Sequence, residues 1–142
     1  MRIGSAGAEP PIGGTAAASA IRAVLTGERA GQAVISLTYV SGQRMRALNR
    51  RTFGRDRATD VIAFGMQHDR RTVADIYVCP SVAAAAARTR GIALREEVTR
   101  LLIHGTLHAL GHDHPAGSTR VRSPMWLRQE RYLRRVLAGG AR

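Results

Sequence analysis

A cluster of histidines constrains this 142-residue chain more than any other feature, because four of its five histidines lie between His104 and His114. His104 and His108 are four positions apart in a segment whose apolar residues recur with the period of an α-helix. Their imidazoles therefore lie one turn apart on one face, where both can bind the same metal ion. The pattern predicts a helix over residues 94–110, with Gly111 as its stop.

The third metal ligand must come from beyond this helix. If the chain turns at Gly111, either His112 or His114 can reach the ion. The spacing His-x3-His-x2-Gly-x2-His is that of the metzincin zinc proteases, and it favours His104, His108 and His114. Three protein ligands leave a position for water or substrate, which is typical of catalytic zinc rather than structural zinc.

Gly105 and the net charge both argue against peptide hydrolysis. The zinc proteases carry a glutamate directly after the first histidine as their general base, whereas Gly105 stands here. The chain has 22 basic residues, all arginine, against 10 acidic ones, giving a net charge of +12. Such a charge favours an anionic partner, with nucleic acid first and a membrane surface second. A phosphodiester substrate fits both observations, because a metal and arginines can hold its charge.

The length fits one domain over residues 1–142, in which we expect residues 1–14 and 138–142 to be poorly ordered. A single cysteine, Cys79, excludes an internal disulfide and is typical of a reducing compartment. No apolar run approaches the length of a membrane span.

Further elements are predicted from periodicity and turn signals. We expect helices over residues 15–25, from Ser41 to 48 or 49, over 82–90 with Ser81 as cap and Gly91 as stop, and from 123–124 to 137. Strands are predicted at 33–40, 61–64 and 73–78, with a hairpin loop at 68–71. This order indicates an α+β fold with helices against one face of a sheet. In the last helix, Met125, Trp126 and Leu127 are more typical of a core than of a base-stacking surface.

In these residues the chain resembles the YbeY-type rRNA-maturation metallo-endoribonucleases of bacteria. The signature His-Gly-x-Leu-His-x-x-Gly-x-Asp-His stands at residues 104–114, with His112 where the family often has Tyr. Further matches are Leu-Asn at 48–49, Thr-Asp-Val-Ile-Ala-Phe at 59–64, Asp-Ile at 75–76, Met-Trp at 125–126 and Gln-Glu at 129–130. The resemblance covers roughly residues 33–137.

The resemblance implies one Zn²⁺ per chain, bound by His104, His108 and His114. It implies a single domain with a mixed sheet of about four strands packed with helices, and a zinc site at the C-terminal end of a central helix. It also implies a single-strand-specific endoribonuclease of the cytoplasm that acts in 16S rRNA 3′-end maturation and ribosome quality control. Its partners would be RNA, as precursor 16S rRNA, and the ribosome or its small subunit, but neither membrane nor DNA. The metal would polarise the phosphate or activate a bound water.

One departure concerns the arginine that many members carry six residues before the Thr-Asp-Val segment, where this chain has Phe53. Arg51 and Arg55 flank that position, and either can supply a guanidinium to stabilise the phosphate. Together with Arg57 they are candidate substrate-binding residues, because guanidinium groups bind phosphate oxygens bidentately. Asp113 can either orient a ligand imidazole or cap the turn.

Two other functions are compatible with part of this pattern. A metzincin-like zinc peptidase would share the ligand spacing, and a non-catalytic RNA- or ribosome-binding factor would use zinc only to stabilise its fold.

Overall fold

The sheet has four strands, of which three are parallel. A computed structural model describes residues 1–113 and 123–139 of the chain. Within them, β1 (Arg2–Ala6), β2 (Gln32–Val40), β3 (Val61–His68) and β4 (Arg71–Val78) form a sheet of order β1-β2-β4-β3. β2 is parallel to both β1 and β4, whereas β3 and β4 form an antiparallel hairpin. The predicted α+β class and mixed four-stranded sheet are confirmed.

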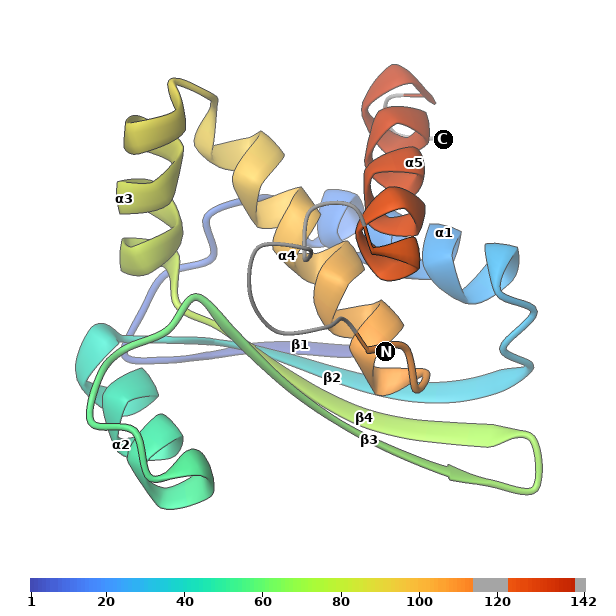
Figure 1. Cartoon of the computed structure of the whole chain (residues 1–142), viewed down its shortest axis with the longest axis horizontal. Helices are drawn as coiled ribbons and strands as arrows, with labels where there is room; N and C mark the ends of the chain where they lie inside the picture. Colours follow the sequence, from blue (N-terminus) through green and yellow to red (C-terminus); the bar gives the residue numbers. More distant parts are fainter. Residues whose placement is uncertain (114–122, 140–142) are drawn as a thin grey trace.

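A central helix organises the side of the sheet that carries most of the core. The five helices of the described residues are α1 (Gly14–Gly27), α2 (Gly42–Phe53), α3 (Pro80–Arg90), α4 (Leu94–Ala109) and α5 (Pro124–Gly139). α4 contacts β3 and β4 below it and is surrounded by α1, α3 and α5 (Figure 1). None of the helices in these ranges is long and apolar enough to span a membrane.

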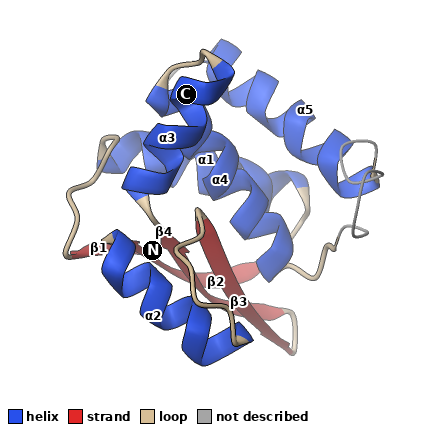
Figure 2. Ribbon diagram, turned by 60° about the vertical axis from the view of Figure 1, so that its left-hand side comes forward, coloured by secondary structure: helices blue, strands red, loops and turns tan. Residues whose placement is uncertain are grey.

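The two faces of the sheet differ in how much they bury. Alternate residues of β2 and β4, among them Leu37 and Ile76, are almost fully buried against α4 and α1. On the opposite face, Met45 of α2 packs against Ile62 of β3 near one end (Figure 2). The expectation that the helices cover one face is therefore wrong for α2, which covers part of the other.

Several local predictions are confirmed by backbone geometry. The Ser41 hydroxyl accepts a hydrogen bond from the backbone N–H of Arg44 and so caps α2, at 3.2 Å. The hairpin between β3 and β4 turns through Asp69 and Arg70, whose φ angles of 48° and 63° are those of a type I′ turn. Gly91 ends α3 in the left-handed conformation, with φ of 68°.

Other expectations are corrected. Residues 2–6, expected to be a poorly ordered arm, form β1 because β2 offers them a free parallel edge from Ser36 to Val40. Ser81 does not cap α3, which begins at Pro80 with Cys79 as the capping residue. Residues 138 and 139 lie within α5, and residues 140–142 lie outside the described residues.

Candidate functional site

His104 and His108 occupy the C-terminal half of α4, and their rings are neighbours in an edge-to-face arrangement. The ring centroids are 5.2 Å apart and the rings are inclined at 68°. Both side chains are half-buried, which leaves them accessible from the surface. His114 lies outside the described residues, within which no three histidine, cysteine, aspartate or glutamate side chains gather as a metal group. The three-ligand set therefore stays a prediction.

Gln129 of α5 fixes the orientation of the His104 imidazole. Its amide Oε1 lies 2.7 Å from His104 Nδ1, and its Nε2 donates to the carboxylate of Glu130 at 3.0 Å. Because the donation to Glu130 sets the orientation of the amide, Oε1 is the atom that accepts a hydrogen bond from the Nδ1–H of His104. His104 Nε2 is then the ring nitrogen with a lone pair for a metal. A neutral imidazole that carries its proton on Nδ1 is suited to bind zinc through Nε2.

A chain of ion pairs extends from Glu130, the hydrogen-bond partner of Gln129, across three helices. Arg100 of α4 donates to Glu130 through Nε at 3.0 Å and to Glu97 through Nη1 at 2.9 Å. Glu97, whose side chain is only 2% exposed, also accepts from Arg90 of α3 at 3.0 Å. Burial alone would lower the pKa of Arg100, but the carboxylates of Glu130 and Glu97 outweigh it and raise that pKa. The network keeps α3 and α5 aligned against the helix that carries the histidines.

Gly105 lies between the two histidines and faces the sheet. A Cβ at this position would lie 3.1 Å from Cγ2 of Ile76 and 3.4 Å from Cγ2 of Val61. At Gly65 of β3, a Cβ would overlap the backbone of Ala109 at the end of α4. These close contacts place α4 directly on β3 and β4. A side chain at position 105 would therefore press against Ile76 and Val61 at the bottom of the site.

Two of the three predicted arginines share a pocket with the histidines. This arginine pocket has a volume of about 290 Å³ and contains Arg55 and Arg57 together with His104 and His108. Arg51 is not among its residues and lines a separate pocket with Arg46 and Arg50. The remaining residues of the arginine pocket are Asn49, Phe53, Thr59, Asp60, Val61, Ile62, Ala63 and Gly105.

Side chains of α2 hold the loop that carries Arg55 and Arg57. The buried Asn49 donates from Nδ2 to the backbone oxygen of Arg57, at 3.0 Å. Asp56 accepts two hydrogen bonds from Arg46, at 2.7 and 3.0 Å, and these hold the pKa of the Asp56 carboxyl below its usual value. Asn49 and Arg46 thus hold this loop against α2 at two points, and neither contact uses the guanidinium group of Arg55 or Arg57.

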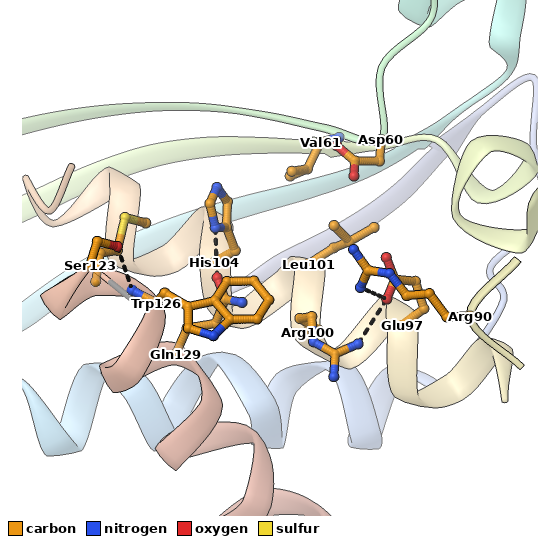
Figure 3. Close-up of a pocket in the computed structure, with 11 residues that line it drawn as sticks. Asp60, Val61, Arg90, Glu97, Arg100, Leu101, His104, Ser123, Trp126 and Gln129 are labelled. Carbon is orange, nitrogen blue, oxygen red and sulfur yellow. Dashed lines mark hydrogen bonds and ion pairs between the residues drawn. The ribbon is translucent and has the colours of Figure 1, made fainter. Parts of the chain in front are cut away.

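A second cavity lies on the other side of His104. This tryptophan pocket has a volume of about 360 Å³ and is lined on one side by Trp126 and Gln129 of α5 (Figure 3). Asp60, Val61 and His104 belong to both pockets. Its other residues are Arg90, Glu97, Arg100, Leu101, Ser123 and Met125.

Met125, Trp126 and Leu127 at the start of α5 were expected to be core residues, and this is correct for only one of them. Met125 is buried, but Trp126 is only half-buried and lines the tryptophan pocket, and Leu127 is 55% exposed. Ser123 caps this end of α5, because its hydroxyl accepts from the backbone N–H of Trp126 at 3.1 Å. The indole is therefore held at the pocket by the first turn of the helix.

His112 is directed to a different partner, Glu28 at the end of α1. Its Nε2 lies 2.7 Å from Glu28 Oε1, and Glu28 Oε2 accepts from Arg128 at 3.0 Å and from the Tyr132 hydroxyl. Burial would raise the pKa of Glu28, but the three donors together lower it. Burial and the bond to Glu28 raise the pKa of Tyr132 to about 12. Asp113 is exposed, and its role beside an imidazole stays a prediction.

The sequence did not indicate a role for Glu28, and it indicated Gln129 only as part of the Gln-Glu match at 129–130. Glu28 lies 84 positions from the histidine that it contacts, and Gln129 lies 25 positions from His104. No local pattern links residues so far apart. The one signal was the Gln129-Glu130 match in the last predicted helix.

Comparison with known proteins gives a consistent result. The family model described as Endoribonuclease YbeY matches residues 14–137. The chain is 31% identical to Endoribonuclease YbeY of Chlorobaculum tepidum, over 86% of this chain and 88% of that protein. It is 40% identical to the protein of the same name from Sulfurihydrogenibium sp., where the match spans about half of each chain, 56% and 55%.

One solved structure is also similar. The solution structure of TM1509 from Thermotoga maritima superposes with a TM-score of 0.63 at 26% identity. The match covers 97% of this chain and 89% of that one. The similarity thus extends over nearly the whole chain, whereas the family model matches residues 14–137.

Proposed function

The chain belongs to the Endoribonuclease YbeY family, and on that premise we propose that it is a zinc-dependent endoribonuclease specific for single-stranded RNA. Its proposed substrate is the 3′ end of precursor 16S rRNA on the small ribosomal subunit, in the cytoplasm. The observation that carries the proposal is the position of the paired imidazoles of His104 and His108 in one pocket with Arg55 and Arg57.

His104 and His108, with His114, would hold the zinc ion. Bound zinc would supply Lewis-acid polarisation of a phosphate oxygen or of a water. Gln129 keeps the His104 proton on Nδ1, so that the Nε2 lone pair would be available to the ion. Arg55 and Arg57 bind the phosphate oxygens and stabilise the negative charge that develops on them during cleavage.

Zinc peptidase chemistry is disfavoured at this site. Peptidases with the same histidine spacing place a glutamate after the first histidine. Here that position faces Ile76 and Val61 at contact distance. Two arginines beside the histidines suit a phosphodiester better than an uncharged amide.

Cleavage assays test the proposal. The purified protein with zinc should cut a single-stranded RNA, leave the matched duplex and casein intact, and lose activity with a chelator. The variant His108→Ala should be inactive, whereas His68→Ala, at the exposed end of β3, should retain full activity. RNA binding that persists without cleavage, and that His108→Ala does not alter, would instead support a non-catalytic RNA-binding factor.

The rRNA assignment needs its own assay. Small subunits that carry precursor 16S rRNA should yield the mature 3′ end when incubated with the protein. Cleavage of unrelated single strands without processing of these particles would restrict the proposal to RNA cleavage alone.

A further inference from the structure

The tryptophan pocket has the size and position of a second binding site beside the histidines. Its volume of about 360 Å³ lies within the range of pockets that enclose small organic ligands. It shares Asp60, Val61 and His104 with the arginine pocket, so the two cavities meet at the imidazole. A ligand chain that passes over His104 therefore extends into both.

The charges of the tryptophan pocket do not favour phosphate. Its two guanidinium groups, of Arg90 and Arg100, both donate to the buried carboxylate of Glu97. The fourth charged residue, Asp60, is an anion, and its Oδ1 accepts from the backbone N–H of Val61 at 2.7 Å. Asp60 also lines the arginine pocket, so the difference lies in Glu97: a phosphate in the tryptophan pocket would meet two guanidinium groups that are already paired with this buried carboxylate.

The surface that this pocket does offer is aromatic. Trp126 is half-buried, and its indole lines the pocket (Figure 3). Leu101 and the buried Met125 add apolar surface. A flat, uncharged group with polar edges matches this environment, and nucleobases stack on aromatic side chains in this way.

We propose that the tryptophan pocket binds a nucleobase of the RNA strand, stacked on Trp126, next to the phosphate held at the histidines. The inference rests on the proposed RNA cleavage and adds a base subsite to it. The strand runs with phosphates in the arginine pocket and a base in the tryptophan pocket. Because a stack accepts any base, this subsite strengthens binding and excludes duplexes, whose bases are already stacked and paired.

Fluorescence can test this directly, because Trp126 is the single tryptophan of the chain. A short single-stranded 2′-O-methyl RNA is titrated into the unaltered protein, beside a matched strand of equal phosphate number that lacks all bases. We expect the base-bearing strand to quench the emission and to bind more tightly. The abasic strand should bind weakly and leave the emission unchanged. Equal quenching by both strands, or tight binding of the base-bearing strand without quenching, would overturn the base subsite.

Three variants supply an independent measurement. Loss of one base stack in Trp126→Leu should raise KM for single-stranded RNA about 5- to 140-fold. Its kcat and zinc content should change little, since stacking is equal in the ground and transition states. Trp126→Phe, which keeps an aromatic face, should restore most of the affinity. Leu127→Ala, the exposed neighbour on α5, should behave as the unaltered protein.

The possible failures can be told apart. Cleavage by the unaltered protein together with an unchanged KM in Trp126→Leu would overturn the subsite and leave the proposed function standing. Absence of cleavage by the unaltered protein would overturn the proposed function and the subsite with it.

Discussion

The two pockets on either side of His104 use their arginines in opposite ways. In the arginine pocket, Arg55 and Arg57 stand on a loop held by Asn49, and the ion pairs of this loop involve Asp56 and α2. In the tryptophan pocket, the two arginines are paired with Glu97. The number of arginines is equal and Asp60 belongs to both pockets, so the buried Glu97 is the carboxylate that distinguishes them. Under the proposed function, Glu97 makes the arginine pocket the better site for a phosphate.

The largest effect should follow from removing His104, because it belongs to both pockets. His104→Ala and His108→Ala should each lose most of their zinc, and cleavage should fall about a thousandfold or more. Metal analysis and single-turnover cleavage measure the two effects. His112→Ala should keep its zinc, because the His112 Nε2 is bonded to Glu28. Full zinc occupancy in His104→Ala would refute the ligand assignment.

The arginine pocket can be separated from the rest of the basic surface. Arg55→Gln combined with Arg57→Gln should flatten the plot of log K against log salt by roughly 1.4, or about 0.7 for each phosphate contact. Cleavage of bound RNA should fall about a hundredfold, because charge develops on the phosphate in the transition state. Arg51→Gln is the matched control, since Arg51 lines another pocket. Equal losses from Arg51→Gln would mean that the arginine pocket has no special role.

Gln129 tests whether the wall of the tryptophan pocket acts on the metal. Gln129→Leu removes the acceptor at His104 Nδ1 and should weaken zinc binding about 10- to 100-fold. Competition with a chromophoric chelator measures this affinity. Gln129→Glu should retain the affinity, because a carboxylate still accepts from Nδ1. If both variants bind zinc like the unaltered protein, the hydrogen bond serves only packing.

Glu28 gives the smallest effect, which should appear in stability. Its pKa is lowered in the folded state from an ordinary value of 4.5, so its contribution is present above pH 4.5 and is lost as the pH falls through the folded value. Glu28→Gln should therefore lower the free energy of unfolding by about 1–3 kcal/mol at pH 7 and by less at pH 3. Urea unfolding at both values measures the change. An identical difference at both pH values would contradict an electrostatic role.

Glu28 also sharpens the comparison of the pockets. Two of its donors, Arg128 and Tyr132, belong to α5, which carries the tryptophan pocket and not the arginine pocket. At neutral pH, Glu28→Gln should therefore reduce the preference for base-bearing over abasic strands more than it changes the salt dependence. The reverse result would show that α5 does not depend on Glu28 for its position.

Sequence patterns predicted best where local chemistry decides the structure. The Ser41 cap, the turn at Asp69 and Arg70, and the spacing of His104 and His108 all depend on a few neighbouring residues. β1 was missed because its hydrogen bonds come from residues 36–40, which no pattern in residues 2–6 reveals.

The parts of the site that were missed depend on tertiary contacts. Trp126 stands in an amphipathic helix, where a tryptophan is as compatible with a core as with a pocket wall. Its exposure follows from how α5 packs on α4. The choice of Arg55 over Arg51 likewise follows from the end of α2 at Gly54, after which the chain leaves the helical face that carries Arg51.

Gly105 also has an evolutionary consequence. The histidine spacing of this chain is shared with metzincin peptidases, and Gly105 stands where these enzymes carry their general base. A single mutation to glutamate would nevertheless place its new side chain against Val61 and Ile76, whose methyl groups already lie at contact distance from a Cβ. Acquiring that base would therefore require Val61 or Ile76 to shift or to be replaced by a smaller residue. Overpacking of this kind typically costs about 1–3 kcal/mol, so a glutamate at position 105 would be accepted more readily after one of these two sheet residues had become smaller.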